Sequence, residues 1–433
     1  MPAAGPRRSG HARLRYAALD ASFAATPSGT GFPLIGATKT TPKVENAGMS
    51  PSAPDFRPTP SRSRRLAVAT LVAGLIVGPA VGVIAAVTVT YVQVDASGPA
   101  RAVAKAVGDL DRDGRADLVV GSAVGGLYWY KNATWAKRTI NATIKTAEEA
   151  EVADLNGDGA NDVILAIPGG TVWFQNNGTG TAWTQRTLQA DQGLHDIKAA
   201  DLDGDGKLDV IGRGSYPRGN RIFIWRQLSP TSWAASSIAL PEGGTGLVAA
   251  DLDRDRKPDL AIGKYWFKNT GAAGRIAFSA AFTYHAGAEQ DARIAAGDIN
   301  GDGRVDLFIT PPHPTFPGTR TVAWYQAPAN PTAAWTRRVL QTNAPPVLHT
   351  AAIVDLDNDG DNDLAMAMTS QVANPKVVAF FNAGGGSFGP AFTIAAKASH
   401  AMRVVRVAGQ AALFGADYDD RPRSSIDLWR ITP

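Results

Sequence analysis

The 433-residue chain contains no cysteine, so disulfide bonds are excluded and any cross-links of the fold must be of another kind. An excess of positive charge is also lacking outside the N-terminal region. Residues 1–65 hold ten Lys and Arg against three Asp and Glu, which leaves a net charge of −3 on the rest of a chain whose total is +4. Because residues 66–433 show no basic stripe, the composition gives no support to nucleic-acid binding by the folded part.

The N-terminal region reads as a tail followed by a membrane segment. Residues 1–65 are rich in Pro, Ser, Ala, Gly and Arg without apolar periodicity, which predicts a disordered basic tail. Residues 66–86 contain no charge, and as a helix they would span about 31 Å, close to the roughly 30 Å of a bilayer core. Arginines precede this run and no basic residue follows it until Arg101. We therefore expect one transmembrane helix with its N-terminus inside, or an export signal, and a chain that is membrane-anchored or secreted with residues 87–433 outside.

An acidic motif of nine residues occurs six times, for example as DLDGDGKLD from Asp201. Asp or Asn stands at positions 1, 3, 5 and 9 of every copy, and glycine stands at position 6 in five copies. Alternate side chains of a tight turn, joined by the ninth residue from the next strand, form an oxygen cage for a hard cation. The flanks are rich in Val, Ile and Leu, which is typical of β-strands, and Val120 occupies the position where an EF-hand needs glutamate. The motif therefore predicts a strand–loop–strand Ca²⁺ site.

The copies begin at Asp109, Asp154, Asp201, Asp251, Asp298 and Asp355, and we call them the first to sixth loops. The predicted Ca²⁺ ligands are Asp109, Asp111, Asp113 and Asp117; Asp154, Asn156, Asp158 and Asp162; Asp201, Asp203, Asp205 and Asp209; Asp251, Asp253, Asp255 and Asp259; Asp298, Asn300, Asp302 and Asp306; Asp355, Asp357, Asp359 and Asp363.

The six loops are expected to differ in affinity. Asn156 and Asn300 lower the ligand charge of the second and fifth loops, and Arg256 replaces the turn glycine of the fourth. That replacement costs about 1–2 kcal/mol if the position needs a positive φ. We therefore expect weaker binding there than in the first, third and sixth loops. At a free Ca²⁺ concentration tenfold above the dissociation constant, each ion would add about 1.4 kcal/mol of stability, which makes the ions structural first.

The loops belong to a larger repeat, because the copies start 45 to 57 residues apart. A short apolar strand follows each loop, and an aromatic strand and a fourth segment come after it. Four strands in about fifty residues describe one blade of a β-propeller. The aromatic residues that recur in the third strand are expected to pack between blades: Trp129, Trp173, Trp225, Trp266, Trp324 and Phe380.

The C-terminal residues form a seventh unit that keeps three strands and lacks the acidic loop. Residues 87–94 (VTVTYVQV) alternate like a strand and precede the first loop by the distance that the fourth strand keeps elsewhere. Pairing of this segment into the last blade would close the ring and remove two free sheet edges. The sequence thus predicts an all-β, seven-bladed β-propeller with calcium loops over residues 87–433.

These units resemble the FG-GAP/VCBS-type repeats of integrin α-subunit heads and many bacterial surface proteins. The resemblance extends over residues 87–433 and implies a calcium-stabilised propeller that serves as an adhesion or binding module for a carbohydrate or protein partner.

Two candidate sites lie on the expected face opposite the acidic loops. The long connections between second and third strands suit recognition and supply six candidate ligand-binding residues: Tyr216, Arg218, His313, Phe316, Tyr418 and Arg421. The stretch LHDIKAADLDGDG also resembles propeller proteins of carbohydrate metabolism, which implies a sugar-acting lyase or dehydratase as the alternative. Polar residues that recur six positions before the loops, near the expected axis, could serve as its acid, base or metal ligands. The candidate catalytic residues of that alternative are Glu148, His195, His349 and His400.

Overall fold

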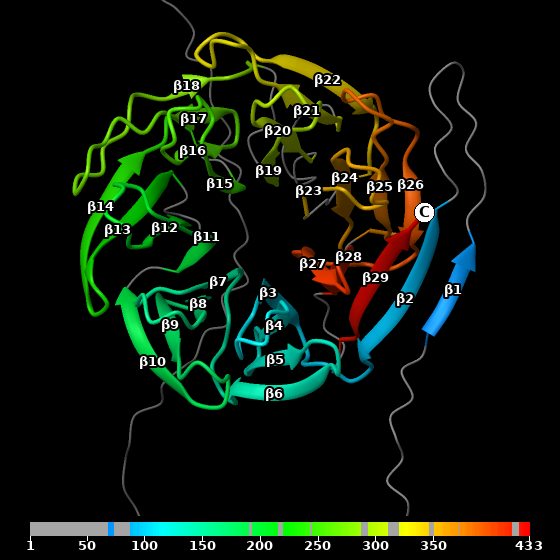
Figure 1. Ribbon diagram of the computed structural model, residues 1–433, viewed down its shortest axis with the longest axis horizontal. Coiled ribbons are helices and arrows are strands. Elements are labelled where there is room, and N and C mark those ends of the chain that lie inside the picture. The colour runs from blue at the N-terminus through cyan, green and yellow to red at the C-terminus, as the bar shows by residue number, and fades with distance from the viewer. Residues whose placement is uncertain are drawn as a thin grey trace, which may run out of the picture. The chain divides into compact units, whose positions relative to one another are not determined.

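The computed structural model describes residues 68–72, 87–189, 193–214, 220–242, 245–286, 293–310, 320–345, 350–370, 372–417 and 424–433. The chain divides into two units, Met1–Ser63 and Arg64–Pro433, and every described residue belongs to the second. The predicted disordered tail therefore lies outside the described residues. All regular secondary structure in these residues is β-strand, and the strands form seven antiparallel sheets around a common axis (Figure 1).

Six blades contain four strands that follow one another in sequence. Blade 1 is β3 (Ala102–Gly108), β4 (Asp117–Ser122), β5 (Leu127–Lys131) and β6 (Ala136–Asn141). Blade 2 is β7 (Ala150–Ala153), β8 (Asp162–Ile167), β9 (Gly170–Asn176) and β10 (Trp183–Gln189). Blade 3 is β11 (Leu194–Ala200), β12 (Asp209–Gly214), β13 (Arg221–Ser229) and β14 (Ser232–Ala239). Blade 4 is β15 (Leu247–Ala250), β16 (Asp259–Ile262), β17 (Tyr265–Phe267) and β18 (Phe282–Thr283). Blade 5 is β19 (Ile294–Gly297), β20 (Asp306–Ile309), β21 (Val322–Gln326) and β22 (Thr336–Gln341). Blade 6 is β23 (Ala352–Val354), β24 (Asp363–Ala367), β25 (Val377–Phe380) and β26 (Phe392–Ala395).

The seventh blade joins the two ends of the ring. Its inner strands are β27 (Arg403–Val407), β28 (Gln410–Ala416) and β29 (Ile426–Thr432), and β2 (Thr88–Asp95) pairs antiparallel with β29. Tyr91 lies opposite Trp429, and its hydroxyl donates to Asp427 Oδ1 at 2.7 Å. The predicted closure of the ring by residues 87–94 is therefore confirmed.

The same sheet carries a fifth strand, β1 (Val68–Val72), which pairs antiparallel with the outer edge of β2. The prediction of a transmembrane helix over residues 66–86 is therefore wrong for Val68–Val72, which form a strand. The edge of β2 offers unpaired backbone groups, and a stretch containing β-branched Val and Thr satisfies them by adding a strand. The remainder of the segment lies outside the described residues. Among the described residues, no helix has the length and apolar character needed to cross a bilayer.

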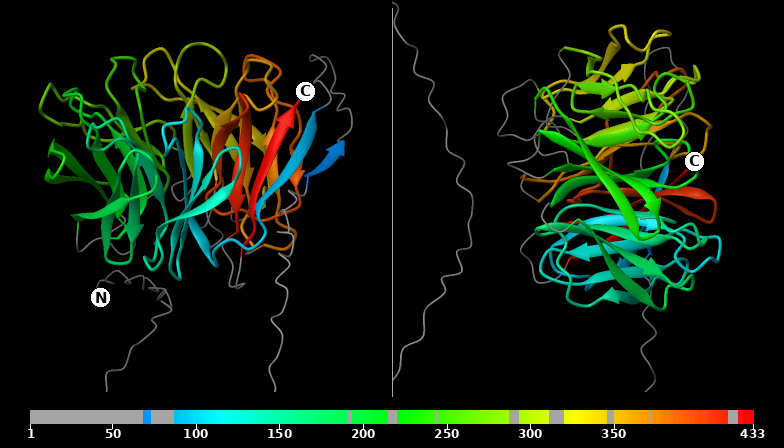
Figure 2. Two further views of the ribbon diagram at one scale, coloured as in Figure 1. Left: turned by 60° about the horizontal axis from the view of Figure 1, so that its bottom comes forward. Right: turned by 90° about the vertical axis from the view of Figure 1, so that its left-hand side faces the viewer.

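The core consists of seven hydrophobic clusters, and each lies between two neighbouring blades. The innermost strands of neighbouring blades contact one another all the way around the ring, from β3 through β27 and back to β3. Figure 2 shows the blades side by side, with their strands running between the two faces of the ring. Hydrophobic burial between blades therefore holds the ring together.

The recurrent aromatic residues are all buried, as predicted, but they do not share one register. Trp129, Trp173, Trp266 and Trp324 each lie opposite the second residue after the position-9 aspartate. Trp225 and Phe380 lie opposite the first residue after it, one position earlier. Because successive side chains of a strand point to opposite faces, Trp225 and Phe380 pack against the preceding blade while the other four pack against the next.

Candidate metal loops and channel site

The position-9 aspartates fasten each loop to its own blade. All six are at most 1% exposed, because each begins the buried second strand. In each, Oδ2 accepts the backbone N–H of loop position 2 at 2.8–3.1 Å. Oδ1 accepts a backbone N–H at the end of the third strand at 2.7–2.8 Å. The six residues are Asp117, Asp162, Asp209, Asp259, Asp306 and Asp363.

These buried carboxyls have raised pKa values. Burial is the largest cause, nearby loop carboxylates add to it, and the accepted N–H bonds oppose it. The pKa rises to about 6 for Asp117, Asp209 and Asp306, and to about 7 for Asp162, Asp259 and Asp363. Negative charge in the loops is therefore unfavourable unless a cation offsets it.

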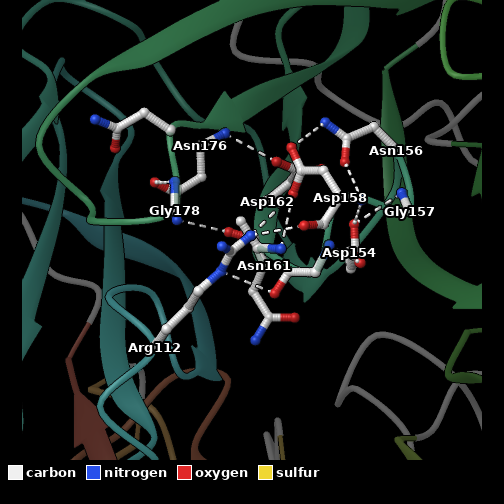
Figure 3. Close-up of polar contacts among 12 residues, drawn as sticks. Arg112, Asp154, Asn156, Gly157, Asp158, Asn161, Asp162, Asn176 and Gly178 are labelled. Carbon is white, nitrogen blue, oxygen red and sulfur yellow. Dashed lines mark hydrogen bonds and ion pairs between the residues drawn. The ribbon is translucent and has the colours of Figure 1, made fainter.

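The position-1 aspartate shapes the turn itself. In the second loop, Asp154 Oδ1 accepts the N–H groups of Gly157 and Asp158 at 2.9 and 3.1 Å, and Oδ2 accepts that of Gly159 at 2.7 Å (Figure 3). Such a turn places two residues in the left-handed region, and in all six loops both position 4 and position 6 have φ between 59° and 99°. Arg256 at position 6 has φ 69°, which confirms that this position needs a positive φ. The strain at position 4, where Arg112, Arg254 and Asn358 replace glycine, was not expected from the sequence.

The loops fit a hard cation by their donor atoms. In four of them, three carboxylates each offer an oxygen within 4.8 Å of the others. The Oδ1 atoms of Asp111, Asp355 and Asp357 are buried and have no hydrogen-bond partner. Clustered carboxylate oxygens with unused acceptor capacity are what Ca²⁺ binds in proteins. The four groups are Asp109, Asp111 and Asp117; Asp201, Asp203 and Asp209; Asp251, Asp253 and Asp255; Asp355, Asp357 and Asp359.

Basic side chains from the third strands reach into three loops, which the sequence analysis did not foresee. Lys131 pairs with Asp111 and Asp113. The corresponding residues, Arg226 in blade 3 and Lys268 in blade 4, pair with positions 3 and 5 of their own loops. The available signal in the sequence was a Lys or Arg in the aromatic segment, directly before an Asn or Gln.

The Asn at the next position is buried, and its amide joins neighbouring loops. Asn176 donates through Nδ2 to Leu110 O in the preceding loop at 2.7 Å and to Asn161 O in its own loop at 2.9 Å. Its Oδ1 accepts the N–H groups of Gly178 and Gly180 at 3.1 and 3.0 Å. Asn269 and Asn382 make the same bonds to the preceding loop, each at 2.8 Å. The amides thus link loops of successive blades on one face of the ring.

A cavity of about 280 Å³ lies at the other end of the innermost strands. Its walls come from the starts of β7, β11, β15, β19, β23 and β27, whereas the acidic loops follow the ends of the innermost strands. Apolar residues line much of it, and five charged side chains also face it: Glu149, Asp196, Lys198, Arg293 and Arg403.

These charged groups pair across the channel. Arg403 Nη2 lies 3.1 Å from Glu149 Oε1, which joins blades 7 and 2, and Lys198 Nζ lies 3.4 Å from Glu149 Oε2. Arg293 Nη1 lies 3.0 Å from Asp196 Oδ1, which joins blades 5 and 3. Burial alone raises the pKa of Asp196, but His195 and Arg293 outweigh it and hold this pKa well below its usual range. Lys198 and Arg403 likewise outweigh burial and lower the pKa of Glu149. Both carboxylates are therefore charged at neutral pH.

The predicted catalytic residues that the structure describes do not line this cavity, but each stands one or two residues before a lining residue in the sequence. His195 Nδ1 is 3.1 Å from Asp196 Oδ2, and His400 Nε2 is 4.0 Å from Glu148 Oε2. His349 lies outside the described residues. So do all six candidate ligand-binding residues: Tyr216, Arg218, His313, Phe316, Tyr418 and Arg421. Four of the charged cavity residues could not be predicted from the sequence, because their only signal was a position at the start of an innermost strand: Glu149, Asp196, Arg293 and Arg403.

Lys105 is a further buried charge beside the channel. It is 0% exposed on β3, and its Nζ donates to Ala102 O at 2.7 Å and to His400 O in the last blade at 2.5 Å. Burial, with a smaller contribution from Arg403, lowers the pKa of Lys105 to about 7.

Comparison with known proteins agrees with this architecture. A family model described as FG-GAP-like repeat matches residues 109–165 and 154–212. No curated protein matches the chain. Among solved structures, a lectin of Agrocybe aegerita that recognises non-reducing terminal N-acetylglucosamine is similar with a TM-score of 0.50 and 17% identity, over 78% of this chain and 86% of that chain. BBS1N in complex with ARL6DN is similar with a TM-score of 0.51 and 10% identity, over 77% of this chain and 94% of that chain.

At these identities the likenesses concern the fold. The repeat period, the six acidic loops, the ring of blades and the family match agree with one another. The described part of the chain is a seven-bladed β-propeller, and residues 109–212 of it match the FG-GAP-like repeat.

Proposed function

We propose that the chain is a calcium-stabilised binding module that works outside the cytoplasm and takes a carbohydrate ligand at the channel mouth. The observation that carries the proposal is the cavity of about 280 Å³ onto which Glu149, Asp196, Arg293 and Arg403 converge from four blades. Small-molecule sites of proteins have volumes from roughly 300 Å³ upward and combine apolar walls with a few oriented polar groups. The cavity is slightly smaller than the lower limit of that range, which suits a ligand of about one sugar unit.

The charge pattern favours a neutral, hydroxyl-rich ligand. Each carboxylate already has a cationic partner within 3.1 Å. Lys198 is the third cation and also pairs with Glu149, so the five charged side chains leave a net charge of only +1 for a strongly charged ligand. A sugar hydroxyl can donate to Glu149 or Asp196 and accept from Arg293 or Arg403 at the same time. The lectin of similar fold recognises a terminal sugar, so this architecture is compatible with sugar binding. The complex of BBS1N with ARL6DN makes a protein partner the other outcome to test.

Calcium is assigned to the acidic loops. The carboxylates of positions 1, 3, 5 and 9 would hold it, and when bound it supplies positive charge that offsets their repulsion. The position-9 aspartates and the amides such as Asn176 link the loops to the blades, so neutralising the loops stabilises the ring.

Export rests on the sequence. Residues 66–86 are uncharged and follow a cluster of arginines, and we assign them to an export signal, so that the pairing of β1 with β2 belongs to the chain before the signal is removed. N-terminal sequencing of the chain from the host's medium and cell fractions tests this assignment. A chain found only in the cytoplasm with residues 66–86 intact contradicts it.

The ligand is tested with the purified full chain on a glycan array and in a pull-down, in millimolar Ca²⁺ and in EDTA. We expect binding to a defined set of glycans in Ca²⁺ and loss of binding in EDTA. Lys198→Met removes one cavity side chain and should weaken glycan binding at least tenfold. Arg338→Met, an equivalent change on the exposed outer strand β22, should leave binding unchanged. Binding of a protein partner without any glycan, or equal effects of the two variants, overturns the assignment.

The lyase or dehydratase reading has one observation in its favour, the pair of His195 and the buried carboxylate of Asp196. A histidine oriented by a carboxylate is an arrangement that general bases use. Turnover of a bound glycan by the full chain, abolished by His195→Ala at unchanged melting temperature, would support that function. Glycan binding without turnover supports the binding module.

A further inference from the structure

The position-5 carboxylate of the acidic loops contacts a side-chain nitrogen of its own blade in five loops. The sixth loop differs: among the described residues, Asp359 accepts a hydrogen bond only from the backbone N–H of Asp361, at 2.9 Å. The five nitrogen–carboxylate pairs are Lys131–Asp113, Asn156–Asp158, Lys207–Asp205, Lys268–Asp255 and Asn300–Asp302, at 2.6–3.0 Å.

The nitrogen has two sources. In the first and fourth loops it belongs to the last residue before the third-strand amide position. In the second, third and fifth loops it belongs to loop position 3 or 7, and the sixth loop has Asp357 and Asp361 at those positions.

Blades 1, 3 and 4 have a basic residue directly before the third-strand amide position, and blades 2 and 5 have Gln175 and Gln326. Blade 6 has Phe381, which is 2% exposed and packs on Phe392 with ring centroids 5.5 Å apart. An apolar ring thus stands where three other blades place a cation against their loops.

The net charge of the sixth loop is also the most negative of the six, and the contrast is largest with the fourth loop. The sixth loop contains five aspartates, including Asp361 at position 7, and no Lys or Arg. The fourth loop contains four aspartates and three basic residues, and Lys268 adds a further cation. Repulsion among the carboxylates is therefore offset internally in the fourth loop and is not offset in the sixth.

Unused acceptor atoms point into the sixth loop. Asp355, Asp357 and Asp359 each offer an oxygen within 4.8 Å of the others. Asp357 is 5% exposed, and the Oδ1 atoms of Asp355 and Asp357 are buried without a hydrogen-bond partner. A buried, negatively charged oxygen without a donor is unfavourable unless it meets a cation.

From these contacts we infer that the six loops are not equivalent: the sixth loop is the tight Ca²⁺ site, and Lys131, Arg226 and Lys268 are built-in cations that compete with Ca²⁺ in the first, third and fourth loops. The inference rests on the proposed role of calcium and deepens it. It also revises the expected order of affinity, because the first and third loops have ligands as acidic as those of the sixth but already hold a cation.

Isothermal titration of the chelator-treated full chain with CaCl₂ tests the inference, together with melting in Ca²⁺ and in EDTA. We expect one ion per chain to bind at least tenfold more tightly than any other. Asp357→Asn should abolish that ion and most of the rise in melting temperature that low Ca²⁺ produces. Asp253→Asn, the same change in the fourth loop, should leave the tight ion in place.

A variant that gains Ca²⁺ binding provides the second part of the test. Lys268→Gln installs the residue that blades 2 and 5 already carry, so the fold tolerates it. We expect this variant to bind a second ion tightly and to melt at a lower temperature than the parent in EDTA. Six ions of equal affinity, or an unchanged ion count in Lys268→Gln, overturns the inference and leaves the proposed role of calcium intact. No heat of Ca²⁺ binding and no melting shift contradicts that role itself.

Discussion

Arg403 and Glu149 form an ion pair of 3.1 Å across the channel, although 254 residues separate them in the sequence. The pair joins blade 7 to blade 2 and passes over blade 1, so it depends on closure of the ring. Glu149 is 8% exposed, and its second oxygen accepts from Lys198 Nζ at 3.4 Å. The two cations together keep a buried carboxylate charged.

We expect Arg403→Met to destabilise the propeller by about 3 kcal/mol, since it removes one of the two cations that offset the buried charge of Glu149. Glu149→Gln in the same chain should restore part of that loss, because the amide needs no counterion. Urea unfolding of the two single variants and the double variant measures the coupling. Additive effects of the two changes would contradict a direct pair.

Arg256→Gly is expected to stabilise the fourth loop by about 1 kcal/mol. Arg256 has φ 69°, a conformation that costs a residue with a Cβ but not glycine. Gly206→Ala in the third loop is the matched reverse change: Gly206 has φ 84°, and a Cβ there meets no atom within 4 Å, so only backbone strain is added. Thermal unfolding in Ca²⁺ should move in opposite directions for the two variants. The same direction for both would show that strain at position 6 is not the cause.

The blades and their closure were predictable because their signals are local and repeated. The acidic motif fixes the turn between first and second strands, and six copies in phase identify the blade without any knowledge of long-range contacts. Residues 87–94 were identified as the missing strand because the last unit was one strand short, and β2 occupies that place. The strand β1 was hidden, since an uncharged run of Val, Leu and Ala reads equally well as a membrane helix.

The contacts between blades were less predictable. A shift of one residue moves Trp225 to the opposite face of its sheet relative to Trp129, and the spacing of aromatic residues in the sequence does not reveal such a shift. Pairing of Arg403 with Glu149 depends on the diameter of the closed ring. The candidate site at the channel mouth therefore emerged only from the structure, whereas the carboxylates of the loops were visible in the sequence.

Asn176→Ala is expected to cost about 2–4 kcal/mol, because the change leaves Leu110 O and two backbone N–H groups without their buried partners. Asn177→Ala, next to it and exposed, should cost well below 1 kcal/mol. Urea unfolding of both variants in Ca²⁺ gives the comparison. If the two variants unfold at the same urea concentration, the amide does not link the loops of blades 1 and 2.

Lys105 gives the propeller a pH dependence of a defined sign. Its pKa is about 7 in the folded chain and 10.5 in the unfolded chain, so between these values the unfolded chain binds one more proton. Stability from this group therefore rises with pH through that window, by about 1.4 kcal/mol per pH unit, and the contribution of Lys105 is flat below pH 7.

Lys105→Met removes this dependence and leaves the other titrating groups in place. Urea unfolding at several pH values between about 7.5 and 9.5 should show the parent chain gaining about 1.4 kcal/mol more per pH unit than the variant does. Lys137→Met, a change of an exposed lysine on the outer strand β6, controls for the loss of a positive charge. Parallel pH profiles for the parent and Lys105→Met would mean that Lys105 keeps an ordinary pKa in the folded chain. In that case the carbonyls of Ala102 and His400 stabilise its ammonium group between blades 1 and 7 as well as water does.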